Sequence, residues 1–345
     1  MAQDERIGLV QEIEGEAAQG GRISIGRALD RHPASIATMR AAATSRPVPG
    51  EVLMTLVAIL WGSAFPVTRV LLEDLPPLGA AAWRTLLAAG GVALFAAARG
   101  EFGSLIPVRG VRLRLLVLAL LGGPLFVMGM NVAVLLTGAS ITSFVTGTYP
   151  LLAVAVAALL LGESLGRRVG LALATATVGL VLLARPGGAH VELLGVVVAL
   201  GAALSFAIYL GLARLWGSAE RLPTLTIAFW LLVSSMTVTG VLQLIVEPAG
   251  LGLTLSTGGW AALVWLALPA SALPHVLVVA TMRRMPASRA APFLLLMPIS
   301  GTLIAAALLG ERLDLIQLVG GGLILVGIAA ATVRRRVVLP AQVPG

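Results

Sequence analysis

Long runs of apolar residues alternate with short polar segments from Val52 to Val333. A helix rises about 1.5 Å per residue, so about 20 apolar residues cross the roughly 30 Å hydrocarbon layer of a bilayer. Ten runs come near this length, at residues 52–72, 79–98, 113–136, 141–161, 169–184, 193–212, 225–246, 260–282, 291–309 and 315–333. The pattern predicts an all-α polytopic membrane protein with ten transmembrane helices.

The segment 139–184 returns, in weaker form, as residues 287–332. One shift of 148 positions (287 minus 139) superposes four landmarks without a gap, which indicates an internal duplication. The landmarks are Ala139–Ser140, Pro150, Gly162–Glu163 and Gly179 with their counterparts Ala287–Ser288, Pro298, Gly310–Glu311 and Gly327. Copies of five spans each, an odd number, must lie in opposite orientations. We therefore predict two inverted five-helix repeats, residues 51–186 and 187–336, the architecture of many secondary transporters.

Residues 1–50 differ from the rest, because they are polar and mixed in charge. They show no secretory signal pattern. We expect a disordered or weakly helical cytoplasmic tail, with a later start of the protein at Met39 or Met54 as the alternative. Residues 337–345 are expected to form a short C-terminal tail.

The arginines test this arrangement of spans. With a cytoplasmic N-terminus, fourteen loop arginines fall inside and only Arg185 and Arg312 fall outside. Such a bias is the positive-inside rule. It predicts a multi-pass protein of the inner (plasma) membrane with both termini in the cytoplasm.

Composition supports lipid as the solvent. The chain of 345 residues is 58% hydrophobic and 12% charged, with a mean hydropathy of +0.98. Average soluble proteins are about 25% charged. The net charge of +8 is carried by arginines in short loops, so we reject a nucleic-acid partner. Cysteine is absent and the histidines His32, His190 and His275 are scattered, so we expect no metal site and no cofactor.

Four motifs carry a family resemblance. They are Trp61-Gly62-Ser63-Ala64-Phe65, Pro76-Pro77 with Ala82-Trp83-Arg84, and the segments from Pro150 to Glu163 and from Pro298 to Glu311. In this order, and over about Val52 to Arg336, the chain resembles the EamA-type family of the drug/metabolite transporter superfamily. The resemblance implies ten helices in two inverted repeats, a central cavity, and transport of small metabolites, often outward.

Several polar and aromatic residues are candidates for lining the substrate cavity. Arg84 carries a charge inside a span, so it is a functional candidate with a substrate carboxylate, Glu73 or Asp74 as its partner, or else a residue that snorkels to the interface. Thr142, Thr146 and Tyr149 share one helical face, although such hydroxyls often bond their own backbone. The full set of candidates is Trp61, Ser63, Phe65, Arg84, Asn131, Thr142, Thr146, Tyr149, Tyr209, Trp230 and His275.

Pro150 and Pro298 lie within their spans and are candidate hinges, because proline frees the carbonyl four residues earlier. A static kink is the competing interpretation. Glu163 and Glu311 lie at helix ends, where a structural role is expected, and Glu163 could pair with Arg167. Glycines near 162–170 and 320–322 allow close helix contacts, within the chain or between two copies of a homodimer.

These observations predict a secondary transporter, not an enzyme, that exports a small neutral, zwitterionic or amphipathic metabolite or drug-like compound by alternating access. Its partners are then the lipid bilayer and the small-molecule substrate. A second hypothesis is an intramembrane enzyme acting on a lipid, which would need paired histidines or acids. A transporter of a phosphorylated or sugar-type metabolite, and a channel or scaffold, are further hypotheses. The sequence leaves open the substrate, direction, coupling ion and oligomeric state.

Overall fold

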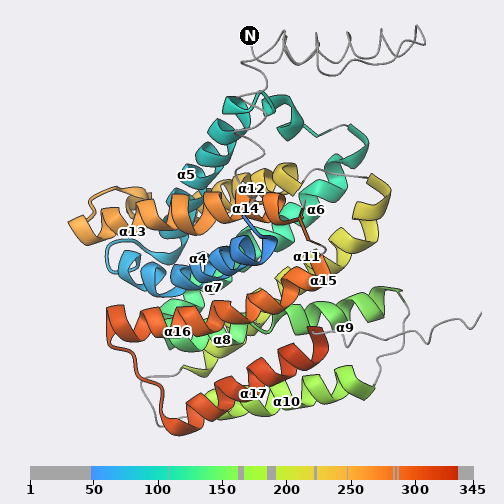
Figure 1. Cartoon of the computed structure of the whole chain (residues 1–345). Coiled ribbons are helices and arrows are strands. Elements are labelled where there is room, and N and C mark those ends of the chain that lie inside the picture. The colour runs from blue at the N-terminus through green and yellow to red at the C-terminus, as the bar shows by residue number, and fades with distance from the viewer. Residues whose placement is uncertain are drawn as a thin grey trace, which may run out of the picture. The chain divides into compact units, whose positions relative to one another are not determined.

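The computed structural model describes residues 48–107, 109–161, 167–184, 192–220, 224–246, 248–282, 284–285 and 287–332 (Figure 1). All regular elements in these residues are helical, which confirms the all-α prediction. Residues 1–47 and 333–345, which include most of the predicted N-terminal tail and all of the C-terminal one, lie outside the described residues, as does Glu163.

The described part of the first half contains seven α-helices. They are α4 (Gly50–Leu71), α5 (Pro77–Ala98), α6 (Arg112–Gly122), α7 (Pro124–Thr137), α8 (Ala139–Thr146), α9 (Tyr149–Leu161) and α10 (Arg167–Leu183). Two 3₁₀ turns, η1 (Phe102–Leu105) and η2 (Arg109–Val111), connect α5 to α6. Pro77 begins α5, a favourable position because the N–H that proline lacks has no partner there.

The second half follows a similar order. Its helices are α11 (Leu193–Glu220), α12 (Thr224–Val246), α13 (Thr257–Ala267), α14 (Leu273–Met282), α15 (Ala287–Ala290), α16 (Leu296–Leu309) and α17 (Leu315–Thr332). A 3₁₀ turn, η3 (Pro248–Leu251), precedes α13. The π-helical turn η4 (Leu268–Ala272) joins α13 to α14, and the 3₁₀ turn η5 (Ala291–Leu295) joins α15 to α16.

Eight segments of the described chain are long and apolar enough to cross a membrane. They are Gly50–Leu71, Pro77–Ala98, Arg112–Thr137, Ala139–Leu160, Leu193–Ala213, Thr224–Val246, Thr257–Val278 and Pro292–Leu309. The two remaining predicted spans correspond to α10 and α17, which are shorter. The 17 residues of α10 extend about 25 Å, less than a full bilayer core. Ten spans therefore stay a prediction.

The two short helices α10 and α17 pack against each other along their lengths (Figure 1, bottom). A Cβ at Gly179 would overlap the carbonyl oxygen of Gly320, and one at Gly320 would overlap that of Gly179. Their backbones thus touch where glycine allows it. For Gly320, the close helix contact that we predicted is made within the chain.

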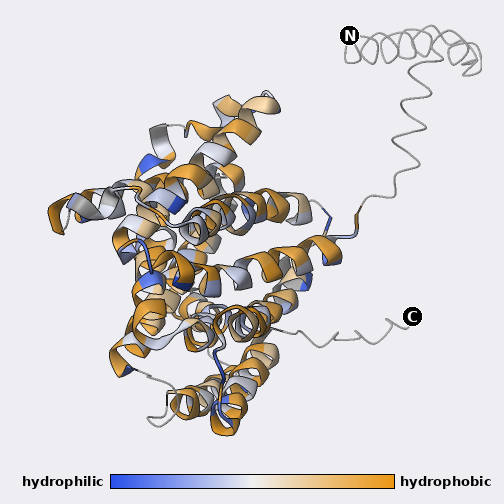
Figure 2. Cartoon of the chain, turned by 90° about the vertical axis from the view of Figure 1, so that its left-hand side faces the viewer, coloured by the Kyte–Doolittle hydropathy of each residue, from blue (hydrophilic) through white to orange (hydrophobic). Residues whose placement is uncertain are grey.

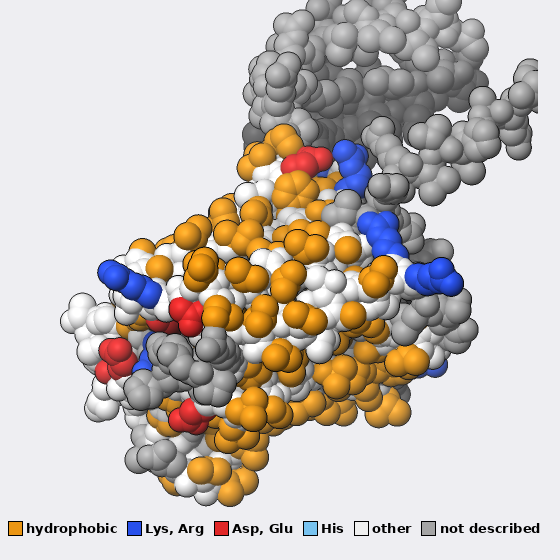
Figure 3. Space-filling model, turned by 90° about the horizontal axis from the view of Figure 1, so that it is seen from below, with side chains coloured by type: hydrophobic (Ala, Val, Ile, Leu, Met, Phe, Trp, Pro, Cys, Tyr) orange, Lys and Arg blue, Asp and Glu red, His pale blue; other side chains and the backbone are white. Residues whose placement is uncertain are grey.

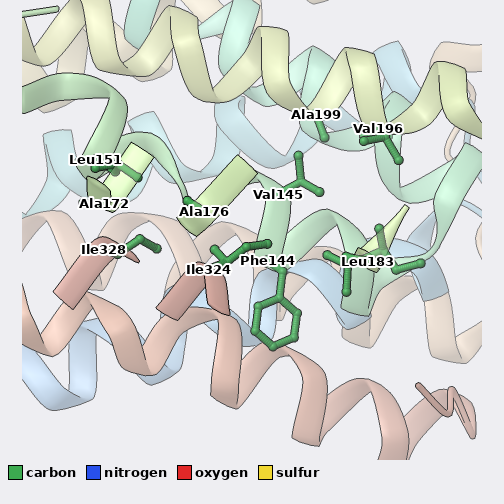
Figure 4. Close-up of a cluster of buried hydrophobic side chains, with 12 residues drawn as sticks. Phe144, Val145, Leu151, Ala172, Ala176, Leu183, Val196, Ala199, Ile324 and Ile328 are labelled. Atoms are coloured by element: carbon green, nitrogen blue, oxygen red, sulfur yellow. The ribbon is translucent and has the colours of Figure 1, made fainter. Parts of the chain in front are cut away.

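Phe144, Ile324 and Ile328 belong to a buried apolar cluster that joins α10 and α17 to α8, α9 and α11 (Figure 4). Elsewhere α4 packs against α16, α5 against α12, and α11 against α7 and α9. These contacts link the first half of the chain to the second. The two halves are therefore interleaved rather than separate.

Hydrophobic positions extend along most of each helix, and the most hydrophilic ones lie mainly near helix ends and loops (Figure 2). One face of the molecule is a broad field of hydrophobic side chains with charged side chains at its margins (Figure 3). Exposed Leu94, Leu113, Leu159 and Leu171 illustrate how much apolar surface faces outward. A surface of this kind is stable in lipid and not in water.

Candidate functional site

Arg84, Ser271 and His275 come together where α5 meets the π-helical turn η4. Arg84 is only 7% exposed, and its Nε donates to Ser271 Oγ at 3.0 Å. His275 Nδ1 lies 2.6 Å from the Ser271 carbonyl oxygen, which can only accept, so Nδ1 carries the proton. The structure thus joins two sequence candidates, Arg84 and His275, through a serine that the sequence analysis did not select.

Trp61 of α4 contacts this group, whereas Ser63 of the same helix contacts α13. The Trp61 ring stands edge-on to the His275 ring, with centroids 6.1 Å apart. Ser63 Oγ accepts from Trp265 Nε1 at 2.9 Å and donates to the Leu60 carbonyl at 2.7 Å. The turn η4 contacts both α4 and α5, and α14 contacts α4, so this region brings three of the predicted candidates together, Arg84, His275 and Trp61.

Aromatic candidates form a second cluster around Phe206 of α11. Its ring centroid lies 5.0 Å from that of Tyr149, 5.1 Å from Tyr209 and 4.7 Å from Phe126. Phe65 belongs to the same buried group. Such offset and edge-on pairs each add about 0.5–1.5 kcal/mol beyond area burial. Three predicted candidates, Phe65, Tyr149 and Tyr209, therefore pack together in this cluster.

Thr142 and Thr146 are fully buried, and their hydroxyls bond the backbone of their own helix. Thr142 Oγ1 donates to the Gly138 carbonyl and Thr146 Oγ1 to the Thr142 carbonyl, both at 2.6 Å. The helical face that we predicted for them with Tyr149 is interrupted, because α8 ends at Thr146 and α9 begins at Tyr149. These hydroxyls therefore serve the local backbone.

Asn131 and Trp230 also bond the backbone of neighbouring elements. Asn131 Nδ2 donates to the Pro77 carbonyl at 3.0 Å and so ties α7 to the start of α5. Trp230 Nε1 donates to the Leu105 carbonyl at 2.8 Å and so ties α12 to η1. Neither contacts the group around Arg84 by a hydrogen bond in the described residues.

Pro150 and Pro298 lie near the starts of α9 and α16, just after interruptions of their spans. Gly147 and Thr148 separate α8 from α9, and η5 precedes α16. Two other spans are interrupted as well, between α6 and α7 at Gly123 and between α13 and α14 at η4. Discontinuous helices are where transporters place their substrate sites.

Glu311 lies beyond the end of α16 and contacts the first half of the chain. Its Oε1 accepts from Ala139 N at 2.9 Å and its Oε2 from Ser140 N at 2.8 Å. Both N–H groups belong to the first turn of α8, where a helix favours negative charge. Gly138, at φ +83°, turns the chain tightly before α8. The Glu163–Arg167 pair that we predicted lies outside the described residues.

The structure also identifies functional candidates that the sequence analysis did not select: Ser271, Phe126 and Phe206. Ser271 carries a sequence signal, because it stands between Pro269 and Pro274 in an apolar run. Two prolines so close together disturb the helix and expose backbone groups. Among the described residues, no group of three acidic or histidine side chains could hold a metal ion.

Comparison with known proteins decides the family. The family model described as "EamA-like transporter family" matches residues 48–185 and again 193–333, which together form most of the chain. The chain belongs to the EamA-like transporter family. It is therefore a membrane transporter, and neither an intramembrane enzyme, nor a channel, nor a transporter of phosphorylated or sugar-type metabolites is favoured.

Two curated relatives of this EamA-like chain are both named "Probable amino-acid metabolite efflux pump". The one from Salmonella typhimurium is 28% identical over 310 residues, covering 85% of this chain and 98% of the relative. The one from Escherichia coli is 27% identical over 290 residues, covering 80% and 92%. A solved structure, described only as "Crystal structure of protein", is 21% identical with a TM-score of 0.57 and covers 82% of this chain and 96% of its own. It supports the fold alone.

Proposed function

We propose that this EamA-like protein exports a small amino-acid-type metabolite across the cytoplasmic membrane. The observation that carries the proposal is the family match over both halves, together with two relatives named as amino-acid metabolite efflux pumps that are aligned over nearly their whole lengths. Amino acids and their derivatives are small zwitterions or weak amphiphiles, the substrate class that the sequence favours.

Transport proceeds by alternating access between two inverted five-helix repeats. The duplication of residues 139–184 as 287–332 and the double family match support two repeats. The interruptions support them too, because they fall in the third and fourth spans of the first half and in the third and fourth spans of the second. Pro150 and Pro298 act at these interruptions as hinges.

A flux assay tests the export function. Purified protein is reconstituted in liposomes loaded with single radiolabelled amino acids, or with their N-acetyl and O-acetyl derivatives, and loss of label is followed over time. Efflux of at least one of these compounds, faster than from protein-free liposomes, supports the proposal. Uniform failure of the whole panel, with protein that is folded by its thermal transition, contradicts it.

Thiol labelling tests the inverted repeats. Because the sequence contains no cysteine, the introduced thiol is the site in this protein that reacts. Ser164→Cys and Arg312→Cys place one thiol beside Glu163 and one beside Glu311. A membrane-impermeant maleimide added to intact cells should label the second variant and not the first. Labelling of both from one side excludes the inverted arrangement.

A further inference from the structure

The guanidinium of Arg84 is buried and incompletely paired. It lies about 10 Å along α5 from Pro77, at about 1.5 Å per residue. Its Nε donates to Ser271, but its Nη1 is enclosed and has no hydrogen-bond partner in the described part of the chain. A buried donor that is left unpaired costs about 1–3 kcal/mol, and more when it is charged. The fold therefore retains an unfavourable group at this position.

The acidic residue Asp74, expected as a partner, is engaged elsewhere. Asp74 Oδ2 accepts from the Ser256 backbone N–H at 3.0 Å and from its hydroxyl at 2.7 Å, at the start of α13. No acidic side chain within the described ranges, Glu73 included, forms an ion pair with Arg84. Arg84 is thus a buried cation that lacks a counter-charge among the described residues, an arrangement that favours an anionic ligand.

A second donor lies next to this cation. Ser271 Oγ accepts from Arg84 Nε and makes no other hydrogen bond among the described residues, so its hydroxyl hydrogen is free to donate. The π-helical turn η4 sets the position of Ser271, and π turns in helices are frequent at functional sites. His275 Nδ1 donates to the Ser271 carbonyl.

The number of charges indicates the ligand. One guanidinium balances one negative charge, whereas a phosphate ester would leave a net charge in the apolar interior. Arginine N–H donors match the two oxygens of a carboxylate in geometry. We propose that Arg84 Nη1 and the Ser271 hydroxyl bind the carboxylate group of the exported metabolite. This inference rests on the proposed export function and names the group by which that function recognises its substrate.

The test uses matched acid and amide pairs in reconstituted full-length protein: leucine, phenylalanine and serine, each with its carboxamide. Wild-type protein should export the acid at least about tenfold faster than the amide, because only the acid carries the counter-charge. Arg84→Gln should lose about tenfold of the acid flux and leave the amide flux unchanged, and Arg84→Lys should recover part of the loss. Arg69→Gln is the matched control, since Arg69 is partly exposed and donates to the Leu135 carbonyl. The acid and amide fluxes of Arg69→Gln should equal those of the wild-type protein.

Two results overturn the assignment while leaving the export function intact. One is equal flux of acids through wild type and Arg84→Gln. The other is an equal loss of acid and amide flux in Arg84→Gln when its thermal transition is normal, because that pattern belongs to a structural arginine.

A binding measurement tests the carboxylate site independently of transport. It is informative even if none of the six compounds is exported. The thermal transition is measured with sodium propionate, sodium chloride or sodium sulfate at equal ionic strength. Propionate should raise the transition temperature of wild type and of Arg69→Gln but not of Arg84→Gln. An equal rise with chloride, or no rise with propionate, contradicts a carboxylate site. A lack of flux with a propionate response contradicts only the proposed export function.

Discussion

Both carboxylate oxygens of Glu311 accept hydrogen bonds from the first turn of α8, whereas Arg84 keeps Nη1 enclosed without a partner among the described residues. Both residues connect the two halves of the chain, since Glu311 follows α16 and contacts α8, while Arg84 belongs to α5 and contacts η4. They differ in how completely the fold satisfies the charge.

That difference separates two uses of charge in an apolar protein. A carboxylate whose oxygens are satisfied at a helix N-terminus stabilises the fold. A buried cation with a free donor lowers stability, and replacing such a group by an apolar one is often neutral or favourable. Function is where proteins retain such unfavourable groups. Glu311 should therefore affect stability and Arg84 transport, and each substitution below tests that division.

The largest effect is expected for Arg84→Met, which keeps an unbranched side chain and removes the charge. Carboxylate export should fall at least about tenfold, the equivalent of one or two charged hydrogen bonds. The thermal transition should stay level or rise, because the unpaired buried donor is gone. Flux in liposomes and tryptophan fluorescence on heating measure the two quantities, with Arg69→Met as the control. A clear fall in transition temperature would instead make Arg84 a structural residue.

Glu311→Ala should show the opposite pattern. Removing the carboxylate leaves the Ala139 and Ser140 N–H groups without these acceptors, which costs about 1–3 kcal/mol. The transition temperature should fall, while the ratio of acid to amide flux per folded molecule stays unchanged. Arg312→Ala, one residue further on, is the control for general effects in this loop. An unchanged transition in Glu311→Ala would remove the distinction between the two charges.

The sequence predicted the helical class well, because run length and hydropathy depend on each segment alone. All eight membrane-length segments fall on predicted runs. It also selected Arg84 and His275, since a charge or imidazole inside an apolar run is conspicuous in one dimension. It did not predict that they meet through Ser271, because the π turn that places this serine depends on packing between helices.

Other parts of the candidate site depend on contacts that hydropathy does not reveal. Phe206 lies in a predicted span, but its position among Phe126, Tyr149 and Tyr209 arises from the approach of α11 to α7 and α9. The threonines of α8 looked like a polar lining, yet their hydroxyls bond their own backbone. The presence of a Ser or Thr in a span does not reveal whether its hydroxyl group donates to its own helix backbone or faces a cavity.

A smaller effect is expected for Ser271→Ala. It removes the acceptor of Arg84 Nε and the hydroxyl proposed to donate to the carboxylate, but it leaves the guanidinium charge. The KM for the acid should rise about three- to tenfold with little change in kcat, since the loss of one hydrogen bond costs a net of about 0.5–1.5 kcal/mol and Nη1 still binds. Thr175→Ala, which removes a hydroxyl bonded to its own helix away from the site, is the control. A loss in kcat alone would place Ser271 in the conformational step instead.

The smallest effect is expected for Trp265→Phe, which tests whether a satisfied polar contact between α4 and α13 behaves like Glu311. The substitution removes the 2.9 Å hydrogen bond from Trp265 Nε1 to Ser63 and keeps an aromatic ring. Because Ser63 retains its bond to the Leu60 carbonyl, the loss should be about 0.5–1.5 kcal/mol in the free energy of unfolding. The acid-to-amide flux ratio should not change, since Arg84 and Ser271 are untouched. A reduced ratio would show that Trp265 takes part in recognition, and the division between satisfied contacts that serve stability and unsatisfied ones that serve transport would then fail.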